Sequence, residues 1–385
     1  MIDYRNTFVE VDNSIIENNA RILCEAFPHE YNIGVIKGNA YGHGYGVVPA
    51  LIKGGINAFA VSNLNEALEV RKYDKEHPVI MLQPVHKEYL ELCSKENISV
   101  CVNDKETFED IVSSGFKLLV QIKVDCGMNR LGFKDTKEFT DVFNATLNNP
   151  NLVLEGVFSH FHTAGITDSE YEKNLNKFKE ITANVDLTKA KMVHVDKTQT
   201  LILHETPSFA NAARIGIALF GFTTVHDFPG SLKGKIRKFE QQIKNKKNNI
   251  LPCKPIKEYP VKPAFKLISE VIQVKETEAG EYVGYGLTHC AAQKEYVATV
   301  DVGYADGLSK KRLGTNVAIN GKVYPIIGIV GMGMIEVLAD ETIKKYDRVT
   351  VLGGEVPIVS ITRHQGCSMY ELMTQLDFSI PRKYI

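Results

Sequence analysis

Short apolar runs alternate with amphipathic helical patterns from about residue 30 to residue 220, and this alternation limits the possible folds more than any other feature. Strands that alternate with helices form parallel βαβ units, and eight such units close most simply into a (β/α)8 barrel. A doubly wound sheet is the alternative, but its first turn typically carries a GxGxxG fingerprint, which we do not find. The candidate strands are residues 33–37, 57–61, 79–82, 98–102, 118–124, 152–158, 192–195 and 214–220.

A helix is expected before the first of these strands, over residues 13–27. Asp12 is a suitable N-cap because its carboxylate can accept a backbone N–H of the first turn. The apolar side chains recur at helical spacing and predict one buried face. They are Ile16, Ala20, Leu23 and Phe27.

The composition changes after the last candidate strand and indicates a second domain. A lysine-rich stretch with almost no aromatic residues favours a solvated connector over a nucleic-acid patch. The rest of the chain contains further strands, and Asn320-Gly321 lies between two of them as a two-residue hairpin turn. The expected domains are a barrel (1–225), a connector (226–262) and a mostly β domain (263–385), with which a strand at about residues 7–11 pairs.

The overall composition excludes several classes of protein. The net charge is −1, so there is no basic excess for nucleic acid or an anionic membrane. The 7 cysteines form no CxxC pair, which fits reduced thiols better than a disulfide framework or a zinc site. The first residues lack an apolar signal core, and no run is long enough to span a bilayer. We expect a soluble cytoplasmic protein with no metal, no nucleic-acid partner and no membrane segment.

Residues 35–46 read Val-Ile-Lys-Gly-Asn-Ala-Tyr-Gly-His-Gly-Tyr-Gly and join a candidate strand to a glycine-rich loop. Lys37 lies at the carboxyl end of that strand, where burial lowers the pKa of an amine and frees it to react. The glycines let the backbone approach a bound group closely. The segment suits a lysine that forms a Schiff base with pyridoxal 5′-phosphate (PLP). Taken alone, it is also compatible with an ordinary surface lysine before a turn.

Polar side chains also lie at other candidate strands of the barrel. The fifth strand leads into Lys123 and Arg130, the sixth into His160, and the eighth begins at Arg214 and contains Gly216. Reactive groups of a (β/α)8 barrel come from the carboxyl ends of its strands, so we expect these residues around one site. A glycine near the last strand fits the usual phosphate site of such barrels, where backbone N–H groups receive the anion.

With these motifs the chain resembles the alanine racemases, which are PLP enzymes built from a (β/α)8 barrel and a β domain. The resemblance covers about residue 7 to Ile385, except for residues 226–252, which are longer than the usual connector. It implies racemisation of an amino acid, most simply alanine, by a homodimer with composite active sites. The shared motifs are Val-Ile-Lys-Gly-Asn-Ala-Tyr-Gly-His-Gly, Asp-Cys-Gly-Met-Asn-Arg-Leu-Gly, Arg-Ile-Gly-Ile-Ala-Leu-Phe-Gly, Val-Gly-Tyr-Gly-Leu-Thr, Gly-Tyr-Ala-Asp-Gly and Ile-Pro-Arg.

The resemblance implies a role for each matching residue. Lys37 would be the Schiff-base lysine and the base on one face of the substrate, and Tyr285 of the partner subunit would be the base on the other. Arg214 would hydrogen-bond the pyridine nitrogen, with His160 supporting that contact. The phosphate would be held by Tyr41, Thr198, Gly216, Tyr370 and the backbone of Ile217.

Four further residues are implied near the substrate. Arg130 would face the phenolic oxygen of the cofactor and the substrate carboxylate. Lys123 matches a lysine that is carbamylated in many members, and the carbamate would orient Arg130. Tyr304 and Met332 match residues that approach the substrate from the partner chain.

Two segments depart from the family pattern and leave the substrate open. Residues 328–333, Gly-Ile-Val-Gly-Met-Gly, lack the arginine and aspartate of the Gly-Arg-x-x-Met-Asp found in many members. Residues 194–198, His-Val-Asp-Lys-Thr, differ from the more usual His-Ala-x-Asn-Ser. A racemase of broader range, acting on serine or lysine, is therefore an alternative. Two further alternatives are a PLP barrel decarboxylase and a non-enzymatic PLP-binding protein. The tyrosine of Val-Gly-Tyr-Gly argues against the decarboxylase, in which it would have no function. The β domain argues against the second alternative, because such binding proteins typically lack one.

Overall fold

The computed structural model describes residues 5–162, 168–223, 239, 243, 247 and 259–385. The described residues form two compact units, which we call the barrel unit and the β unit. The barrel unit lies within residues 15–40 and 45–262, and the β unit lies within residues 1–14, 41–44 and 263–385. Most of the predicted lysine-rich connector, 226–262, lies outside the described residues, so its character stays a prediction.

The barrel unit contains an eight-stranded sheet in the order β8-β7-β6-β5-β4-β3-β2-β9, and every ladder in it is parallel. A parallel bridge between Lys197 and Arg214 brings the ends of β8 and β9 together, so the barrel is nearly closed. The predicted (β/α)8 fold is confirmed. Its strands are β2 (Tyr31–Val35), β3 (Ala58–Val61), β4 (Val79–Met81), β5 (Ile98–Val102), β6 (Leu118–Val124), β7 (Leu152–Ser159), β8 (Met192–His194) and β9 (Ala212–Ile215).

The predicted last strand, residues 214–220, is wrong. Strand β9 covers Ala212–Ile215, and a 3-10 turn, η4 (Ile217–Phe220), follows it. Gly216 interrupts the extended backbone with φ −112° and ψ −119°. Arg214 therefore lies near the carboxyl end of its strand, at the edge of the barrel where reactive groups are expected.

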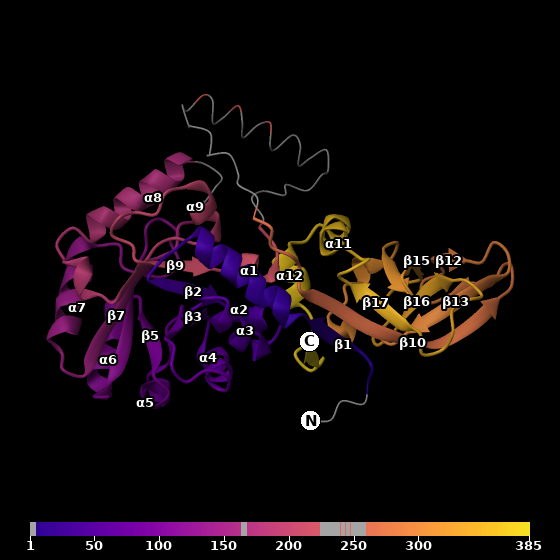
Figure 1. Cartoon of the computed structure of the whole chain (residues 1–385), viewed down its shortest axis with the longest axis horizontal. Helices are drawn as coiled ribbons and strands as arrows, with labels where there is room; N and C mark the ends of the chain where they lie inside the picture. Colours follow the sequence, from indigo (N-terminus) through magenta and orange to yellow (C-terminus); the bar gives the residue numbers. More distant parts are fainter. Residues whose placement is uncertain (1–4, 163–167, 224–238, 240–242, 244–246, 248–258) are drawn as a thin grey trace. The chain divides into compact units, whose positions relative to one another are not determined.

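Helices flank the strands of the barrel unit (Figure 1). In α1 (Asn13–Ala26) the predicted stripe is buried, and Asp12 Oδ1 accepts the N–H of Ser14 at 2.9 Å. The other helices are α3 (Val48–Lys53), α4 (Leu64–Arg71), α5 (Leu90–Lys95), α6 (Lys105–Ser114), α7 (Thr136–Asn148), α8 (Asp168–Ile181) and α9 (Thr198–Leu203). The short turns are α2 (Lys37–Tyr41), whose backbone is left-handed, η1 (Tyr45–Val47), η2 (Lys87–Tyr89) and η3 (Leu187–Lys189).

The β unit contains a second sheet in the order β13-β16-β15-β14-β17-β10-β1-β18, which closes on itself because β10 also pairs with β13. The long strand β10 forms antiparallel ladders with β1, β13 and β17 and so organises the unit (Figure 1). The strands are β1 (Phe8–Val11), β10 (Phe265–Thr277), β11 (Tyr282–Val283), β12 (His289–Cys290), β13 (Glu295–Val300), β14 (Asn316–Ile319), β15 (Lys322–Ile327), β16 (Ile335–Ala339), β17 (Arg348–Leu352) and β18 (Arg382–Tyr384).

Turns and short helices complete the β unit. Asn320 and Gly321 both have positive φ, 51° and 80°, and connect β14 to β15 as the predicted two-residue hairpin. The helical pieces are η5 (Tyr304–Asp306), η6 (Lys310–Arg312), α11 (Ile358–Gln365) and α12 (Met369–Thr374).

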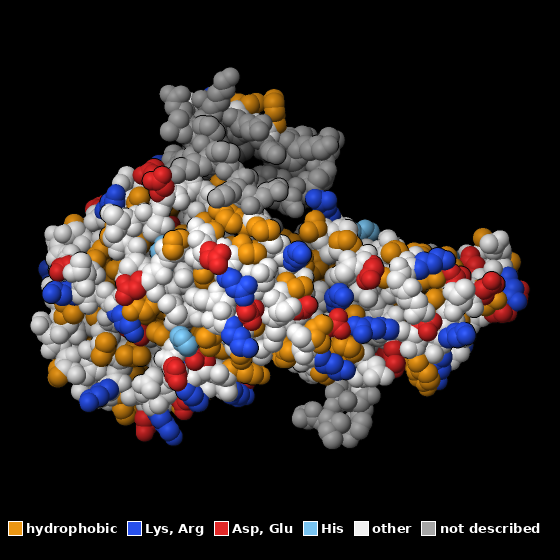
Figure 2. All heavy atoms as spheres, in the orientation of Figure 1, with side chains coloured by type: hydrophobic (Ala, Val, Ile, Leu, Met, Phe, Trp, Pro, Cys, Tyr) orange, Lys and Arg blue, Asp and Glu red, His pale blue; other side chains and the backbone are white. Residues whose placement is uncertain are grey.

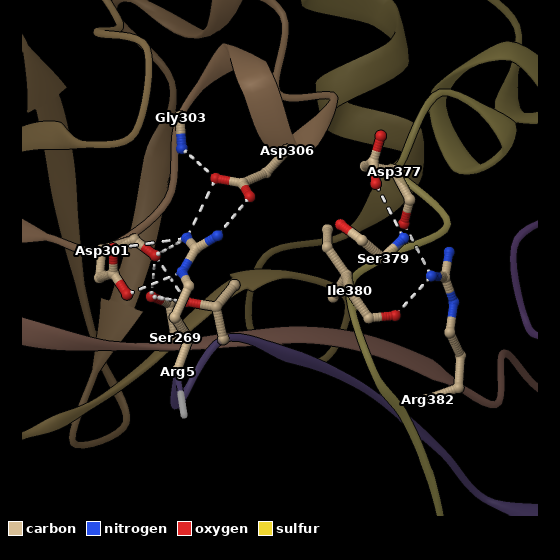
Figure 3. Close-up of polar contacts among 10 residues, drawn as sticks. Arg5, Ser269, Asp301, Gly303, Asp306, Asp377, Ser379, Ile380 and Arg382 are labelled. Atoms are coloured by element: carbon tan, nitrogen blue, oxygen red, sulfur yellow. Dashed lines mark hydrogen bonds and ion pairs between the residues drawn. The ribbon is translucent and has the colours of Figure 1, made fainter. Parts of the chain in front are cut away.

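Hydrogen bonds join residues 5–7 to the rest of the β unit (Figure 3). Arg5 Nε contacts Asp301 Oδ2 at 3.1 Å, and Arg5 NH1 donates to Asp306 Oδ1 at 2.7 Å. Thr7 Oγ1 shares a hydrogen bond with Ser269 Oγ at 2.9 Å. These contacts hold the chain in register immediately before β1.

Acidic and basic side chains are interspersed over the face shown in Figure 2, as the net charge of −1 suggests. Among the residues that the structure describes, no helix is long and apolar enough to cross a membrane. No group of three or more His, Cys, Asp or Glu side chains in the same residues is arranged to hold a metal ion.

Candidate active site

Lys37 lies two residues beyond the end of β2 and opens a turn of left-handed backbone. Gly38, Asn39, Ala40 and Tyr41 all have φ between 50° and 62°. Non-glycine residues in this conformation cost roughly 1–2 kcal/mol each, so the surrounding contacts must impose it. Strained backbone of this kind clusters at functional sites, which draws attention to Lys37.

Glu66 anchors this turn from α4. Its Oε1 accepts the N–H of Gly38 at 2.8 Å, and its Oε2 accepts the N–H of Ser62 at 2.7 Å. One carboxylate thus joins the chain that leaves β2 to the chain that leaves β3. Its position beside the turn fixes the backbone from which Lys37 projects.

The pKa of Lys37 is lowered, chiefly by loss of hydration at the barrel mouth. The positive charges of Arg130 and Arg214 lower it further, whereas Glu66 opposes the shift. A larger fraction of the amine is therefore neutral near pH 7 than for an ordinary lysine, and the neutral amine is the nucleophilic form.

Arg214 is buried, and four of its five N–H groups donate to the protein. Its NH1 group donates to His194 Nδ1 and to His194 O, both at 2.6 Å, and its NH2 group donates to Ser159 O at 2.6 Å and to Val195 O at 3.1 Å. Burial lowers its pKa only to about 10, so the guanidinium stays charged. The Nε–H is the remaining donor, and it bonds none of the described residues.

The bond to Arg214 fixes the tautomer of His194. A guanidinium only donates, so His194 Nδ1 accepts, and the ring proton lies on Nε2. That Nε2 then donates to Gln121 Oε1 at 3.1 Å, and Gln121 Nε2 donates to Glu155 Oε2 at 3.4 Å. Ser99 Oγ donates to the same carboxylate oxygen. A polar chain therefore runs from Arg214 into the interior of the barrel.

His160 is kept neutral by its surroundings. Burial and then the charges of Lys197 and Arg214 lower its pKa to about 2. Lys197 itself donates from Nζ to Phe161 O at 3.0 Å, and burial followed by the charge of Arg214 lowers its pKa to about 8. Among the described residues no hydrogen bond joins His160 to Arg214, the support that was predicted, whereas His194 contacts Arg214 directly.

Lys123 and Arg130 line a small cavity with Asp125 and His160. Burial lowers the pKa of Lys123 to about 8, and its Nζ lies 5.1 Å from the centre of the Phe158 ring. Asp125 shapes the following loop, because its carboxylate accepts the N–H groups of Gly127, Asn129 and Arg130 at 2.9, 3.1 and 3.2 Å. The cavity is thus lined by two basic side chains, and the charge of Arg130 contributes to the lowered pKa of Lys123.

The predicted phosphate residues of the barrel unit lie together. Thr198 Oγ1 accepts the N–H of Gly216 at 3.1 Å, and Ile217 follows at the start of η4. Two other predicted phosphate residues, Tyr41 and Tyr370, belong to the β unit, where their rings form an edge contact with centroids 5.7 Å apart. The predicted set is therefore divided between the two units.

Three more predicted residues lie in the β unit on loops that contact one another. Tyr285 forms an antiparallel bridge with Ile329, and the turn at Tyr304 is joined by backbone hydrogen bonds to the loop at Met332. The side chains of Tyr285, Tyr304 and Met332 are 73%, 38% and 63% exposed. We call these loops, residues 284–287, 303–307 and 328–334, the platform.

Sequence reasoning missed the buried chain that supports Arg214. His194, with Thr198, is predicted among the polar groups at the strand ends, but the sequence indicates neither its bond to Arg214 nor the part played by Gln121 and Glu155. A glutamine and a glutamate inside strands of otherwise apolar residues are the signal that could have revealed them. Gly156 leaves room for Gln121 in this chain, because a Cβ at position 156 would lie 2.1 Å from Gln121 Oε1.

Comparisons with known proteins agree with this architecture. The family model "Alanine racemase, N-terminal domain" matches residues 11–224, and "Alanine racemase, C-terminal domain" matches residues 264–384. Alanine racemase from Streptococcus mutans is 32% identical over 358 residues, which cover 91% of this chain and 89% of that protein.

Solved structures are similarly close. The crystal structure of alanine racemase from E. faecalis has a TM-score of 0.85 and 30% identity, with 99% of each chain covered. Histidine racemase from Leuconostoc mesenteroides has a TM-score of 0.84, with 100% of this chain and 99% of that chain covered, but its 22% identity shows the fold alone.

Proposed function

Because the chain belongs to the alanine racemase family and is therefore an amino-acid racemase, we propose that it interconverts L- and D-alanine with PLP as its cofactor. The mechanism we propose uses two bases, Lys37 and Tyr285 of the partner subunit, within a homodimer. Racemisation requires a proton to leave Cα on one face and to return on the other, which two bases on opposite faces can perform.

The arrangement of Arg214 carries this proposal most directly. Its guanidinium is held by three carbonyls and by His194, and only Nε–H remains to meet a ligand. A donor that keeps its proton suits an unprotonated pyridine nitrogen, because it cannot accept a hydrogen bond in return. Neutral His160 adds no second acid beside it.

The other barrel residues also fit PLP. Lys37 supplies an amine with a lowered pKa for the aldehyde, and Thr198, Gly216 and Ile217 would hold the phosphate, with Tyr41 and Tyr370 from the β unit. The charges of Arg130 and Arg214 act on Lys37, and positive charge there suits an anionic ligand. When bound, PLP withdraws electrons from the Cα–H bond of the substrate.

Arg130 would bind the substrate carboxylate, and Lys123 would orient it after carbamylation. A carbamate forms when the neutral amine attacks CO2 and loses a proton, so a pKa of about 8 favours the reaction. The product carries a negative charge toward Arg130, whereas the free ammonium would repel it.

The exposure of the platform supports a homodimer. Tyr285 and Met332 are more than half exposed, as is Leu287 beside them, although such side chains are usually buried. A second copy of the chain would cover them and would receive the phenol of Tyr285. Two-fold symmetry would give two equivalent sites.

Absorbance spectroscopy with borohydride reduction tests the cofactor assignment. The protein with PLP should show a visible band that borohydride bleaches, and mass spectrometry should find the reduced adduct on Lys37. Lys37→Ala should lose the adduct. Lys197→Met, which removes another lysine with a lowered pKa, should keep it. An adduct on Lys197 or Lys123 would contradict the assignment.

Subunit mixing tests the composite site. Chains carrying Lys37→Ala and chains carrying Tyr285→Phe should each be inactive, and exchange between them should restore activity in one site of each hybrid dimer. Full activity of the wild type in a strictly monomeric preparation would contradict the proposal.

A further inference from the structure

We propose that Arg5 is a positioning residue for racemisation, which holds the platform of one subunit in the shape that the active site of the partner subunit requires. The inference rests on the proposed function, because it takes Tyr304 and Met332 to approach the substrate in a composite site. It assigns a role to a residue that lies near the amino terminus, far in sequence from every group that touches substrate.

Arg5 reaches the platform through Asp306 (Figure 3). Its NH1 and NH2 groups donate to the two oxygens of this carboxylate at 2.7 and 3.2 Å, a bidentate geometry that fixes direction as well as distance. Asp306 is buried, and its Oδ2 also accepts the N–H of Gly303 at 2.8 Å. The carboxylate therefore transmits the position of Arg5 to the first residue of the Tyr304 turn.

The same turn determines the position of Met332. The N–H of Tyr304 donates to Gly331 O, and the N–H of Ala305 donates to Met332 O, both at 2.9 Å. The approach is so close that a Cβ on Gly303 would lie 2.3 Å from Met332 O. A shift of Asp306 would therefore move both substrate-facing side chains together.

Arg5 is poorly placed to act only as a packing residue. Its side chain is 42% exposed, so it fills no part of the core. The segment around it is also held independently of Arg5, because the Thr7 hydroxyl lies within hydrogen-bond distance of Ser269 Oγ and of Asp301 O. Arg5 supplies a counter-charge for buried Asp306, and its hydrogen bonds to Asp306 and Asp301 raise the pKa of Arg5 above its ordinary value.

Arg348 provides a matched control. It also pairs with a carboxylate near the amino terminus, through NH2 and Glu10 Oε2 of β1 at 2.6 Å, and its side chain is likewise exposed. No contact links it to Asp306. Arg5→Met should lower kcat/KM for alanine about tenfold, Arg5→Lys should recover part of the loss, and Arg348→Met should stay within about twofold of the wild type.

Readouts other than activity separate positioning from a folding defect. Arg5→Met should remain dimeric by sedimentation, bind PLP with the wild-type absorbance spectrum and keep the borohydride adduct on Lys37. The inference would be overturned if Arg5→Met lost the dimer, or if its absorbance spectrum differed from that of the wild type.

Placing the substitutions in cis or in trans decides whether Arg5 serves the partner's site. In the first arrangement, Arg5→Met chains are mixed with inactive Lys37→Ala chains. Each hybrid dimer then has one site that combines Lys37 of the Arg5→Met chain with the unaltered platform of the Lys37→Ala chain. The activity of this site should equal that of a wild-type site. When Arg5→Met and Lys37→Ala share one chain, which is mixed with wild type, the live hybrid site receives the altered platform and should stay about tenfold weaker.

The mixture of Tyr285→Phe and Lys37→Ala chains is the reference. If this reference fails to complement, the composite site itself is wrong, and the role of Arg5 falls with it. If the reference complements but the cis and trans arrangements of Arg5→Met have equal activity, only the role of Arg5 is overturned.

Discussion

The barrel site and the platform differ in how complete each is within one chain. In the barrel unit, Arg214 and His194 are buried and bonded through almost every polar atom, so their geometry is set by the fold. On the platform, Tyr285 and Met332 extend into solvent and depend on loop backbone for their positions. Substitution of a buried residue of the barrel site should therefore change both activity and the free energy of unfolding. Substitution of an exposed side chain of the platform should have little effect on folding.

The largest expected effect is on catalysis at the platform. Tyr285→Phe removes the phenolic hydroxyl of an exposed side chain, so kcat should fall by roughly 10²–10⁴-fold through loss of one proton-transfer group. The free energy of unfolding should change by no more than about 0.5 kcal/mol. Steady-state kinetics and urea denaturation of the same preparation check both parts, and a large loss of stability would break the contrast between the two regions.

The second effect is on the stability of the barrel site. Arg214→Met leaves the carbonyls of Ser159, His194 and Val195 without their donor, and we expect a loss of about 3–5 kcal/mol in the free energy of unfolding. Urea denaturation of the protein without PLP measures it. Lys53→Met, at an exposed residue of α3, is a control that should stay within about 0.5 kcal/mol of wild type. A loss below 1 kcal/mol for Arg214→Met would show that the barrel site is as tolerant as the platform.

The third effect has the opposite sign. The folded protein releases the proton of Lys123 near pH 8 instead of near 10.5, so the buried ammonium lowers stability at pH 7 by up to about 3 kcal/mol. Lys123→Met should therefore stabilise the protein at pH 7. The folded state binds fewer protons than the unfolded state between pH 8 and 10.5, so wild-type stability rises through this window and the advantage of the variant disappears.

Thermal melts at pH 7 and pH 10, in CO2-free buffer, check the prediction for Lys123. Added bicarbonate should raise the melting temperature of wild type but not of Lys123→Met, because only the lysine can form a carbamate. Equal stability of both proteins at pH 7 without bicarbonate would mean that burial of the Lys123 ammonium does not destabilise the folded protein.

The smallest expected effect concerns the side chain of the substrate. The segment 328–333 lacks the family's arginine and aspartate, and a Cβ at Gly333 would meet no atom within 4 Å. A wider or less charged entrance should favour serine or larger amino acids by about 1–3 kcal/mol per methylene accommodated. Comparing kcat/KM for alanine, serine, valine, lysine and arginine in wild type and Gly333→Asp tests this. Alanine leading by orders of magnitude in both would show that the segment does not select the substrate.

The sequence was sufficient to predict the barrel because its buried strands are nearly continuous apolar runs that alternate with helical patterns. It misled at residues 214–220, since the four residues of η4 are all buried and have the composition of a strand. The left-handed turn was not predictable either, because Ala40 and Tyr41 have no local preference for positive φ and adopt it only under tertiary constraint.

Contacts between distant segments were also beyond the sequence. The chain from Arg214 to Glu155 depends on the register of neighbouring strands, and the pairing of β6 with β7 shifts between Val120 and Gln121. Arg5 and Asp306 are separated by 301 positions, so no local pattern connects them. The motif around Lys37 is local, so the sequence alone indicates this residue.

Under the proposed function, in which Tyr304 and Met332 approach the substrate, the two backbone hydrogen bonds that join their loops have a consequence for how substrate preference evolves. Residues that share such contacts do not contribute independently, and the coupling between them is typically about 0.5–3 kcal/mol. A mutation that suits a new substrate at one loop will change the geometry at the other, so its benefit will depend on which residue is already present there. Adaptation of this enzyme to another amino acid should therefore proceed by paired changes in both loops, and libraries that vary one loop alone will sample mostly poor solutions.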